Sequence, residues 1–374
     1  MTFPISFYYS NSLKYFIFYT LSGLYGYILR HYYKEKMSTI FQLLLMYTGE
    51  SCAFFFYQYE KYQFKNQSKN AQEENLIYQA ITKKKLYFLL LWCSIVDLIG
   101  TADYSKFIFN HDMKKIDSNY WERGLTCLFI YIHEYYYLKI QTYIHQKLGI
   151  EINLSCLFLT CFIKINNSKS KLSSLLYKIV ICTQFTYIQS FMYIIEKKLN
   201  YEYYININFI CFIEGFFGII ILLFFILFII LFNPFYYHNN IINEIIPRFE
   251  YNNIIFWSIL IPIYIFSLTI VNISRLKIIE KNRPSFIIIG KAFRHLFFSI
   301  ADVFIKEDGN NDIYAILNMF VSLLGSLILG EMIILNFFNL NKYTQNLTSI
   351  RGELETRNSV NIELEINNNI LFID

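Results

Sequence analysis

Long apolar segments separated by short charged ones run along most of the chain. The clearest of them extends from Ile205 to Phe232 and contains the unbroken run GIIILLFFILFIILF. A helix of that length crosses a hydrocarbon core of about 30 Å with some tilt. The apolar residues fall in whole blocks and not on one face of each helix, which is typical of membrane spans. We therefore predict an all-α membrane protein.

The pattern predicts about ten spans, which place both termini on one side of the membrane. The fifth is short and the ninth contains Lys291, Arg294 and His295, so these two have the weakest apolar signal. Loops on the side of the termini, which include Arg275 and Lys277, hold more lysine and arginine than the others. This bias predicts that the termini face the cytosol, or the matrix if the membrane is mitochondrial. The predicted spans are residues 14–30, 38–57, 85–105, 119–138, 148–164, 172–195, 205–232, 253–274, 285–305 and 313–338.

Ten spans divide into two halves of five, an organisation that transporters often use as inverted repeats. Gly49-Glu50 in the second span matches Glu214-Gly215 in the seventh. Arg123-Gly124 in the fourth matches Gly290-Lys291 in the ninth. The predicted organisation is an N-terminal tail (1–13), a first five-helix repeat (14–168), a second five-helix repeat (169–338) and a polar C-terminal tail (339–374).

Ionisable side chains lie inside several apolar segments, above all in the pair of spans between Leu86 and Ile140. A charge at membrane depth costs roughly 2.5–3.5 kcal/mol, so such residues face the interior of a bundle or a water-filled cavity. Two interpretations stay open, because these residues either bind a small anion at mid-membrane or form structural ion pairs with one another. The candidate substrate-binding residues, if the protein is a carrier, are Asp97, Glu122, Arg123, Glu214, Lys291 and Arg294.

For three residues, the spacing along the chain also predicts a shared helix face. Lys291, Arg294 and His295 stand at positions i, i+3 and i+4, which share one helix face and would form an anion site or pair with acidic groups. Glu214 is interpreted as a proton-coupling carboxylate or as the partner in a helix–helix hydrogen bond. His133-Glu134 is expected near the membrane interface.

Composition removes several classes of function. The chain has 38 Phe and 33 Tyr but 13 Gly and 5 Pro, which is typical of AT-rich coding DNA and says little about an aromatic ligand site. The 7 cysteines form no C-x-x-C pair and no zinc spacing, so we expect them to be buried and reduced. A net charge of +5 with lysines mainly in loops gives no support for nucleic-acid binding. Phosphate loops, metalloprotease motifs and nucleophile elbows are absent, so we expect no enzyme activity, cofactor or metal.

A series of short motifs follows in order between residues 15 and 338. They are LMYTGE (45–50), DLIGT (97–101), RG (123–124), HQKLGI (145–150), IEKKL (195–199), IEGFFG (213–218) and SLLGSLIL (322–329). This ordered series resembles the drug/metabolite transporter superfamily, specifically its F-type nucleotide-sugar-transporter-like solute carriers. The resemblance implies ten helices in two inverted repeats and transport of a small anionic metabolite.

The chain departs from that family in two places. The family's ninth span opens with S-A-T-T-R and then D-S-L-R, whereas this chain reads RPSFIIIGKAFRH over residues 283–295, where only Ser285 and Arg294 match. Beside Arg123-Gly124, small residues are replaced by Tyr120-Trp121-Glu122, and the helix continues as HEYYY. Because sliding helices need small residues at their contacts, these aromatics are expected to fill the cavity.

The departures favour a transporter-fold protein recruited as a structural or accessory subunit of a large membrane complex. The alternative is an active carrier of a small anionic metabolite or nucleotide-sugar. The composition points to a respiratory complex of the inner mitochondrial membrane, with an endomembrane as the other location. The expected partners are membrane lipids and other subunits, bound in part through the C-terminal tail, whose alternating NIELEI stretch (361–366) suits a strand added to another sheet.

Overall fold

The described part of the chain is helical. The computed structural model describes residues 10–33, 39–67, 88, 90–98, 115–140, 142–167, 172–203, 205–232, 254–305 and 313–333. These ranges contain ten α-helices, one 3₁₀ turn and no strand, and residues 90–98 include a further helical stretch. The elements are α1 (Ser10–Tyr33), α2 (Thr39–Ser51), α3 (Ala53–Gln67), α6 (Lys115–Tyr137), α7 (Ile144–Asn167), α8 (Leu172–Tyr203), α9 (Ile207–Phe232), α11 (Ile254–Lys281), η2 (Pro284–Phe286), α12 (Ile287–Ile305) and α13 (Ile313–Leu329).

The all-α class is confirmed, and a helix lies within each predicted span, but several boundaries differ. The predicted second span consists of α2 and α3, which meet at a turn at Cys52, and α3 continues to Gln67 through residues predicted as loop. Helices α8 and α11 also run past their predicted ends, because the charged residues of their last turns find partners inside the protein. The last helix ends earlier than predicted, at Leu329. The C-terminal tail and its predicted strand lie outside the described residues.

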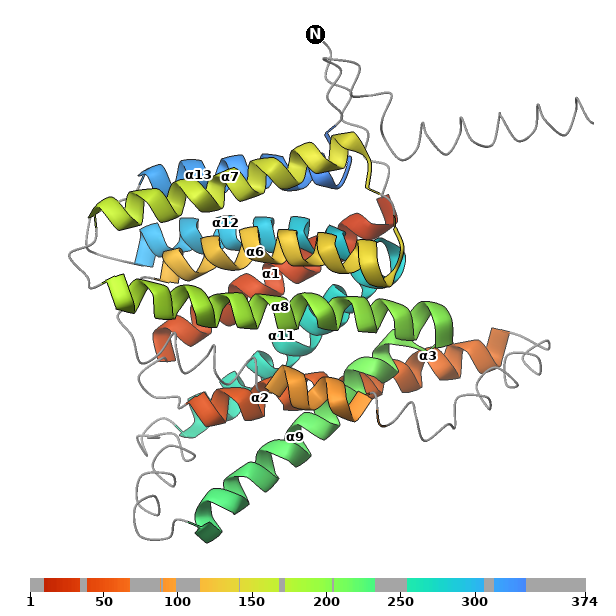
Figure 1. The fold of residues 1–374 in the computed structure, drawn as a ribbon. Coiled ribbons are helices and arrows are strands. Elements are labelled where there is room, and N and C mark those ends of the chain that lie inside the picture. The colour runs from red at the N-terminus through yellow and green to blue at the C-terminus, as the bar shows by residue number, and fades with distance from the viewer. Residues whose placement is uncertain are drawn as a thin grey trace, which may run out of the picture.

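The helices form a bundle in which the two halves of the chain interleave (Figure 1). Helices α7 and α13 lie together at one side, α9 lies at the opposite side, and the remaining helices lie between them (Figure 1). Many helix pairs cross between the halves, among them α1 on α11, α2 on α9, α6 on α8, α6 on α12 and α7 on α13. Equivalent neighbours also pack within each half, with α6 on α7 and α12 on α13.

Glycines bring the helix backbones of different halves into close contact. A Cβ atom at Gly149 of α7 would lie 2.5 Å from the backbone nitrogen of Leu329 in α13. At Gly215 of α9 it would lie 2.5 Å from the backbone nitrogen of Ser51 in α2. Such distances are shorter than any normal contact, so these crossings require glycine, as membrane helix pairs commonly do.

Three helical stretches in the described residues are long and apolar enough to cross a membrane. They are Ile40–Gln63, Ile207–Phe228 and Trp257–Lys281, and the apolar stretch Leu317–Leu329 is shorter. Outward-facing apolar residues are numerous, and on α9 they include Phe224 and Phe228. An apolar exterior around an interior that holds charges is the arrangement expected in lipid.

We predict that Gly149→Ala destabilises the protein by about 1–3 kcal/mol, because the added methyl group meets the α13 backbone, which cannot move away cheaply. Gly26→Ala is the matched control, since its Cβ would lie 3.6 Å from its neighbours. Thermal unfolding of the purified protein in detergent measures both. Equal melting temperatures for the two variants would show that α7 and α13 do not meet at Gly149.

Candidate functional site

A cationic cluster lies between α6 and α12. Lys291 of α12 forms an ion pair with Glu122 of α6, with 2.8 Å between Nζ and Oε1, and also donates a hydrogen bond to Gln189 of α8. The Lys291 side chain is only 1% exposed. The neighbouring Arg123 on α6 is also 1% exposed. Glu122 and Lys291 therefore form a structural ion pair inside the bundle.

The face of α12 that was predicted from spacing joins the same cluster. Arg294 lies over the ring of Tyr19, with 4.8 Å from Cζ to the ring centroid, and its stem passes Gly23, where a Cβ would approach to 2.6 Å. His295 is 1% exposed and lies within electrostatic range of Glu122 and Arg123. Arg123, Lys291 and Arg294 thus bring three cationic side chains close to the carboxylate of Glu122.

A second, carboxylate cluster surrounds Arg275 of α11. Arg275 Nη2 lies 2.9 Å from Glu196 Oε1 on α8 and 4.0 Å from Glu214 Oε2 on α9. Asp97 accepts a hydrogen bond from the hydroxyl group of Tyr47 in α2, at 3.2 Å. The cluster as a whole consists of Glu50, Asp97, Glu196, Glu214 and Arg275, which lie within electrostatic range of one another.

Helix α8 connects the two clusters. Gln189, Tyr193 and Glu196 stand on one face at positions i, i+4 and i+7, and each contacts a cation. The Tyr193 ring lies 5.4 Å from Lys291 Nζ and 5.6 Å from Arg275 Cζ. Both distances are within the range of a cation–π contact, so a single buried ring separates the cationic cluster from the carboxylate cluster.

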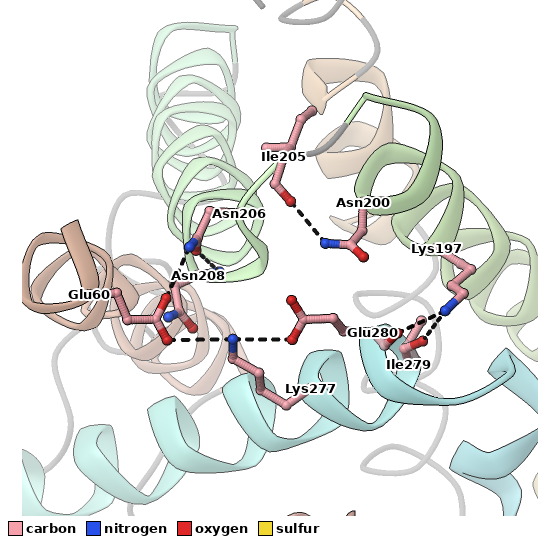
Figure 2. Close-up of polar contacts among 9 residues, drawn as sticks. All are labelled: Glu60, Lys197, Asn200, Ile205, Asn206, Asn208, Lys277, Ile279 and Glu280. Carbon is pink, nitrogen blue, oxygen red and sulfur yellow. Dashed lines mark hydrogen bonds and ion pairs between the residues drawn. The ribbon is translucent and has the colours of Figure 1, made fainter. Parts of the chain in front are cut away.

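A network of polar contacts joins the helices at one end of the bundle (Figure 2). Glu60 of α3 accepts a hydrogen bond from Asn206 at 2.9 Å and forms an ion pair with Lys277 at 3.4 Å. Lys197 donates to the backbone oxygens of Ile279 and Glu280 at the end of α11 (Figure 2). Burial lowers the pKa of Lys197, while the charge of Glu280 acts in the opposite direction. These bonds fix the end of α11, from which α12 and Lys291 follow.

The same end holds further contacts between the halves. Glu134 Oε1 accepts a 2.7 Å hydrogen bond from the backbone nitrogen of Ser285, where α12 approaches. Gln146 accepts from Arg283 at 3.4 Å and donates to Glu331 at 3.1 Å. Glu134 was predicted to lie near the membrane interface, and its burial was not predicted, because the sequence does not show that η2 covers it.

The predicted site residues therefore fall into two groups. Glu122, Arg123, Lys291 and Arg294 come together, whereas Asp97 and Glu214 belong to the carboxylate cluster. Sequence analysis missed Glu196 and Arg275, and it assigned Arg275 to a loop. The available signal was the apolar sequence on both sides of each residue, YIIEKKL and VNISRLKII, which continues the helix past the charge.

Comparisons with known proteins do not assign the chain to a family. No protein-family model matches the chain, and no curated protein matches it. Within the described ranges, no group of three or more His, Cys, Asp or Glu residues is placed to hold a metal ion. What the site offers chemically is thus two clusters of charged side chains inside the bundle, one rich in cations and one rich in carboxyl groups.

We predict that Glu122→Leu destabilises the protein by about 3–5 kcal/mol, because it leaves the Lys291 ammonium group buried beside an apolar side chain. Replacing both partners, as Glu122→Leu with Lys291→Leu, is expected to recover most of that loss, since no uncompensated charge remains from the pair. Unfolding in detergent, analysed as a double-mutant cycle, measures the coupling. Additive effects of the two substitutions would contradict the ion pair.

Proposed function

We propose that this chain is an integral membrane protein of ten helices in two inverted repeats, and that it carries a small anionic metabolite across the membrane. The observation that carries this proposal is the gathering of three cationic side chains, Arg123, Lys291 and Arg294, between α6 and α12, with Arg123 and Lys291 deeply buried. Several cations at one buried position are the chemistry that recognises an anion.

The pattern of helix packing supports two repeats. Exchanging the halves pairs α1 with α8, α2 with α9, residues 90–98 with α11, α6 with α12 and α7 with α13. The contacts α2–α9, α6–α12 and α7–α13 then map onto themselves, and α1–α12 maps onto α6–α8. The contact α1–α11 maps onto that between α8 and residues 90–98, where Leu90 and Leu199 share one apolar cluster. A two-fold relation between the halves accounts for all of these contacts together.

The chemistry of the cationic cluster suits a phosphate or carboxylate group. Arginine presents a fork of N–H donors that matches these two anions, and Arg123 and Arg294 both belong to the cluster. The ring of Tyr193 lies between Lys291 of this cluster and Arg275 of the carboxylate cluster.

The positions of several aromatic residues and glycines are also compatible with transport. The aromatics Tyr135, Tyr136 and Tyr137 were expected to fill the cavity, but they lie on the exterior and are 51–71% exposed. Glycines still mediate close crossings between the halves, at Gly149 and Gly215 among others. Close crossings of this kind are what sliding helices require.

The second candidate function is the structural or accessory subunit predicted from the sequence. It is favoured by the burial of Arg123 and Lys291, each 1% exposed, because a cluster that stays closed has a structural role only. In this alternative the protein belongs to a large complex, for which a respiratory complex of the inner mitochondrial membrane is the proposal drawn from composition. The two candidates make different predictions for the isolated protein.

We predict that the protein reconstituted into vesicles exchanges small anions in a saturable manner. Counterflow is measured with a panel of inorganic phosphate, dicarboxylates, nucleoside monophosphates and nucleotide-sugars. Arg123→Gln should lower uptake roughly tenfold to a hundredfold, the effect of losing hydrogen bonds of about 1.5–3 kcal/mol to a charged group. Lys147→Gln, an exposed residue of α7, is the matched control and should leave uptake unchanged.

Mass analysis of the native protein distinguishes the alternative. A carrier migrates in native gels as one or a few copies of the 44.9 kDa chain with its detergent. Migration with a large complex, together with no saturable uptake of any anion in the panel, would contradict the carrier and support the subunit.

A further inference from the structure

Within the part of the chain that the structure describes, the carboxylate cluster holds more buried carboxyl groups than cations. Glu50, Glu196 and Glu214 lie within electrostatic range of the guanidinium group of Arg275, and Asp97 lies within the same range. If these three glutamates were ionised, they would place three negative charges beside the one positive charge of Arg275. Three of the carboxyl side chains are deeply buried, with Glu50 6%, Glu196 1% and Glu214 6% exposed. Carboxylates that crowd one another away from water do not all ionise together.

The side chain of Glu50 is held in a fixed position within the cluster. Its backbone oxygen accepts from Cys211, and its Cβ lies 2.6 Å from where a Cβ of Gly215 would stand, so the side chain is held against α9. Among the contacts of the described residues, no hydrogen bond or ion pair engages its carboxylate. Among the described residues, Oε1 of Glu214 and Oε2 of Glu196, the oxygen outside the ion pair with Arg275, are buried and lack a hydrogen bond. Buried acceptors of this kind normally have a donor.

A proton is the ligand that fits this arrangement. The described residues include no group suited to a metal ion. Arg275 engages Glu196 and Glu214 through Nη2, while its Nε is buried with no hydrogen bond among the described residues. A proton converts one carboxylate into a carboxylic acid, which removes a negative charge and supplies the missing donor at once. The other titratable groups that face the cluster are Tyr47 of α2, Cys93, Tyr193 of α8 and Cys211 of α9.

We propose that the cluster of Glu50, Asp97, Glu196 and Glu214 around Arg275 is a proton-binding site, and that its proton exchange is coupled to the movement of the anion. In the binding step a carboxylate takes one proton from water and becomes a carboxylic acid, and in the release step it returns that proton to water. The coupling part of the inference rests on the proposed function, whereas proton binding does not.

Helix α8 supplies the physical link between the two sites. It contacts Lys291 through Gln189 and Arg275 through Glu196, and the ring of Tyr193 touches both cations. An anion that draws Lys291 or Arg123 away from their present partners changes the field at Tyr193 and Glu196. A proton gained or lost at Glu196 changes the strength of the ion pair that joins Arg275 of α11 to α8. Each site therefore biases the position of the same helix.

Infrared spectroscopy of the purified protein in detergent tests proton binding without any transported anion. At neutral pH we expect the carbonyl-stretch band of protonated carboxylic acid, which is distinct from the carboxylate bands and shifts in D2O. Glu214→Gln and Glu50→Gln, each nearly isosteric, should reduce the band, whereas Glu151→Gln, at an exposed position of α7, should not. Absence of the band in the unaltered protein, or its loss on adding sodium or potassium ions, would overturn the proposal.

Vesicle transport tests the coupling. With the anion that shows counterflow, a pH gradient imposed without a gradient of that anion should drive its net accumulation in the unaltered protein. Glu214→Gln should abolish accumulation driven by the pH gradient while retaining at least half of the counterflow. Counterflow with no response to the pH gradient in the unaltered protein would overturn the coupling and leave the carrier standing. No counterflow with an intact infrared band would overturn the carrier and leave the proton site standing.

Discussion

The contact between Lys291 and Glu122 constrains the rest of this structure. It joins α6 of the first half to α12 of the second, and a buried charge pair of this kind is strongly unfavourable if either partner is lost. Helices α6 and α12 must therefore face each other with their charged sides inward. Once they do, α7 and α13 follow as their outer neighbours, and the apolar faces of the bundle are left on the exterior.

Helix α8 contacts both charge clusters and lies between them. Gln189, Tyr193 and Glu196 run along one face of it and meet the cationic cluster at one end and the carboxylate cluster at the other. The polar network around Glu60 and Lys277 closes one end of the bundle with contacts that water can replace at small free energy. Glycine crossings such as Gly149 on α13 hold the helices close over their length. The described interior therefore combines two charge clusters with glycine-mediated helix contacts.

The sequence allowed the helices to be predicted because apolar runs of this length have few other solutions. It also placed Lys291, Arg294 and His295 on one face, since i, i+3 and i+4 spacing is local. It did not reveal that Asp97 and Glu214 meet Arg275 and not the cationic cluster, because that depends on which helices are neighbours. Glu196 and Arg275 were missed for a different reason: a charge near the end of an apolar run is read as the start of a loop, and only its partner shows that the helix continues.

The account stands on one claim, that the charges of the two halves meet inside a single lipid-embedded bundle. The most direct test is an experimental density map of the protein in a lipid nanodisc, obtained by electron cryo-microscopy. The account predicts density joining Lys291 to Glu122, with Arg275 between Glu196 and Glu214, all within the lipid belt. Side chains of Lys291 and Arg275 that project into lipid or bulk solvent, with no helices closing around them, would contradict it.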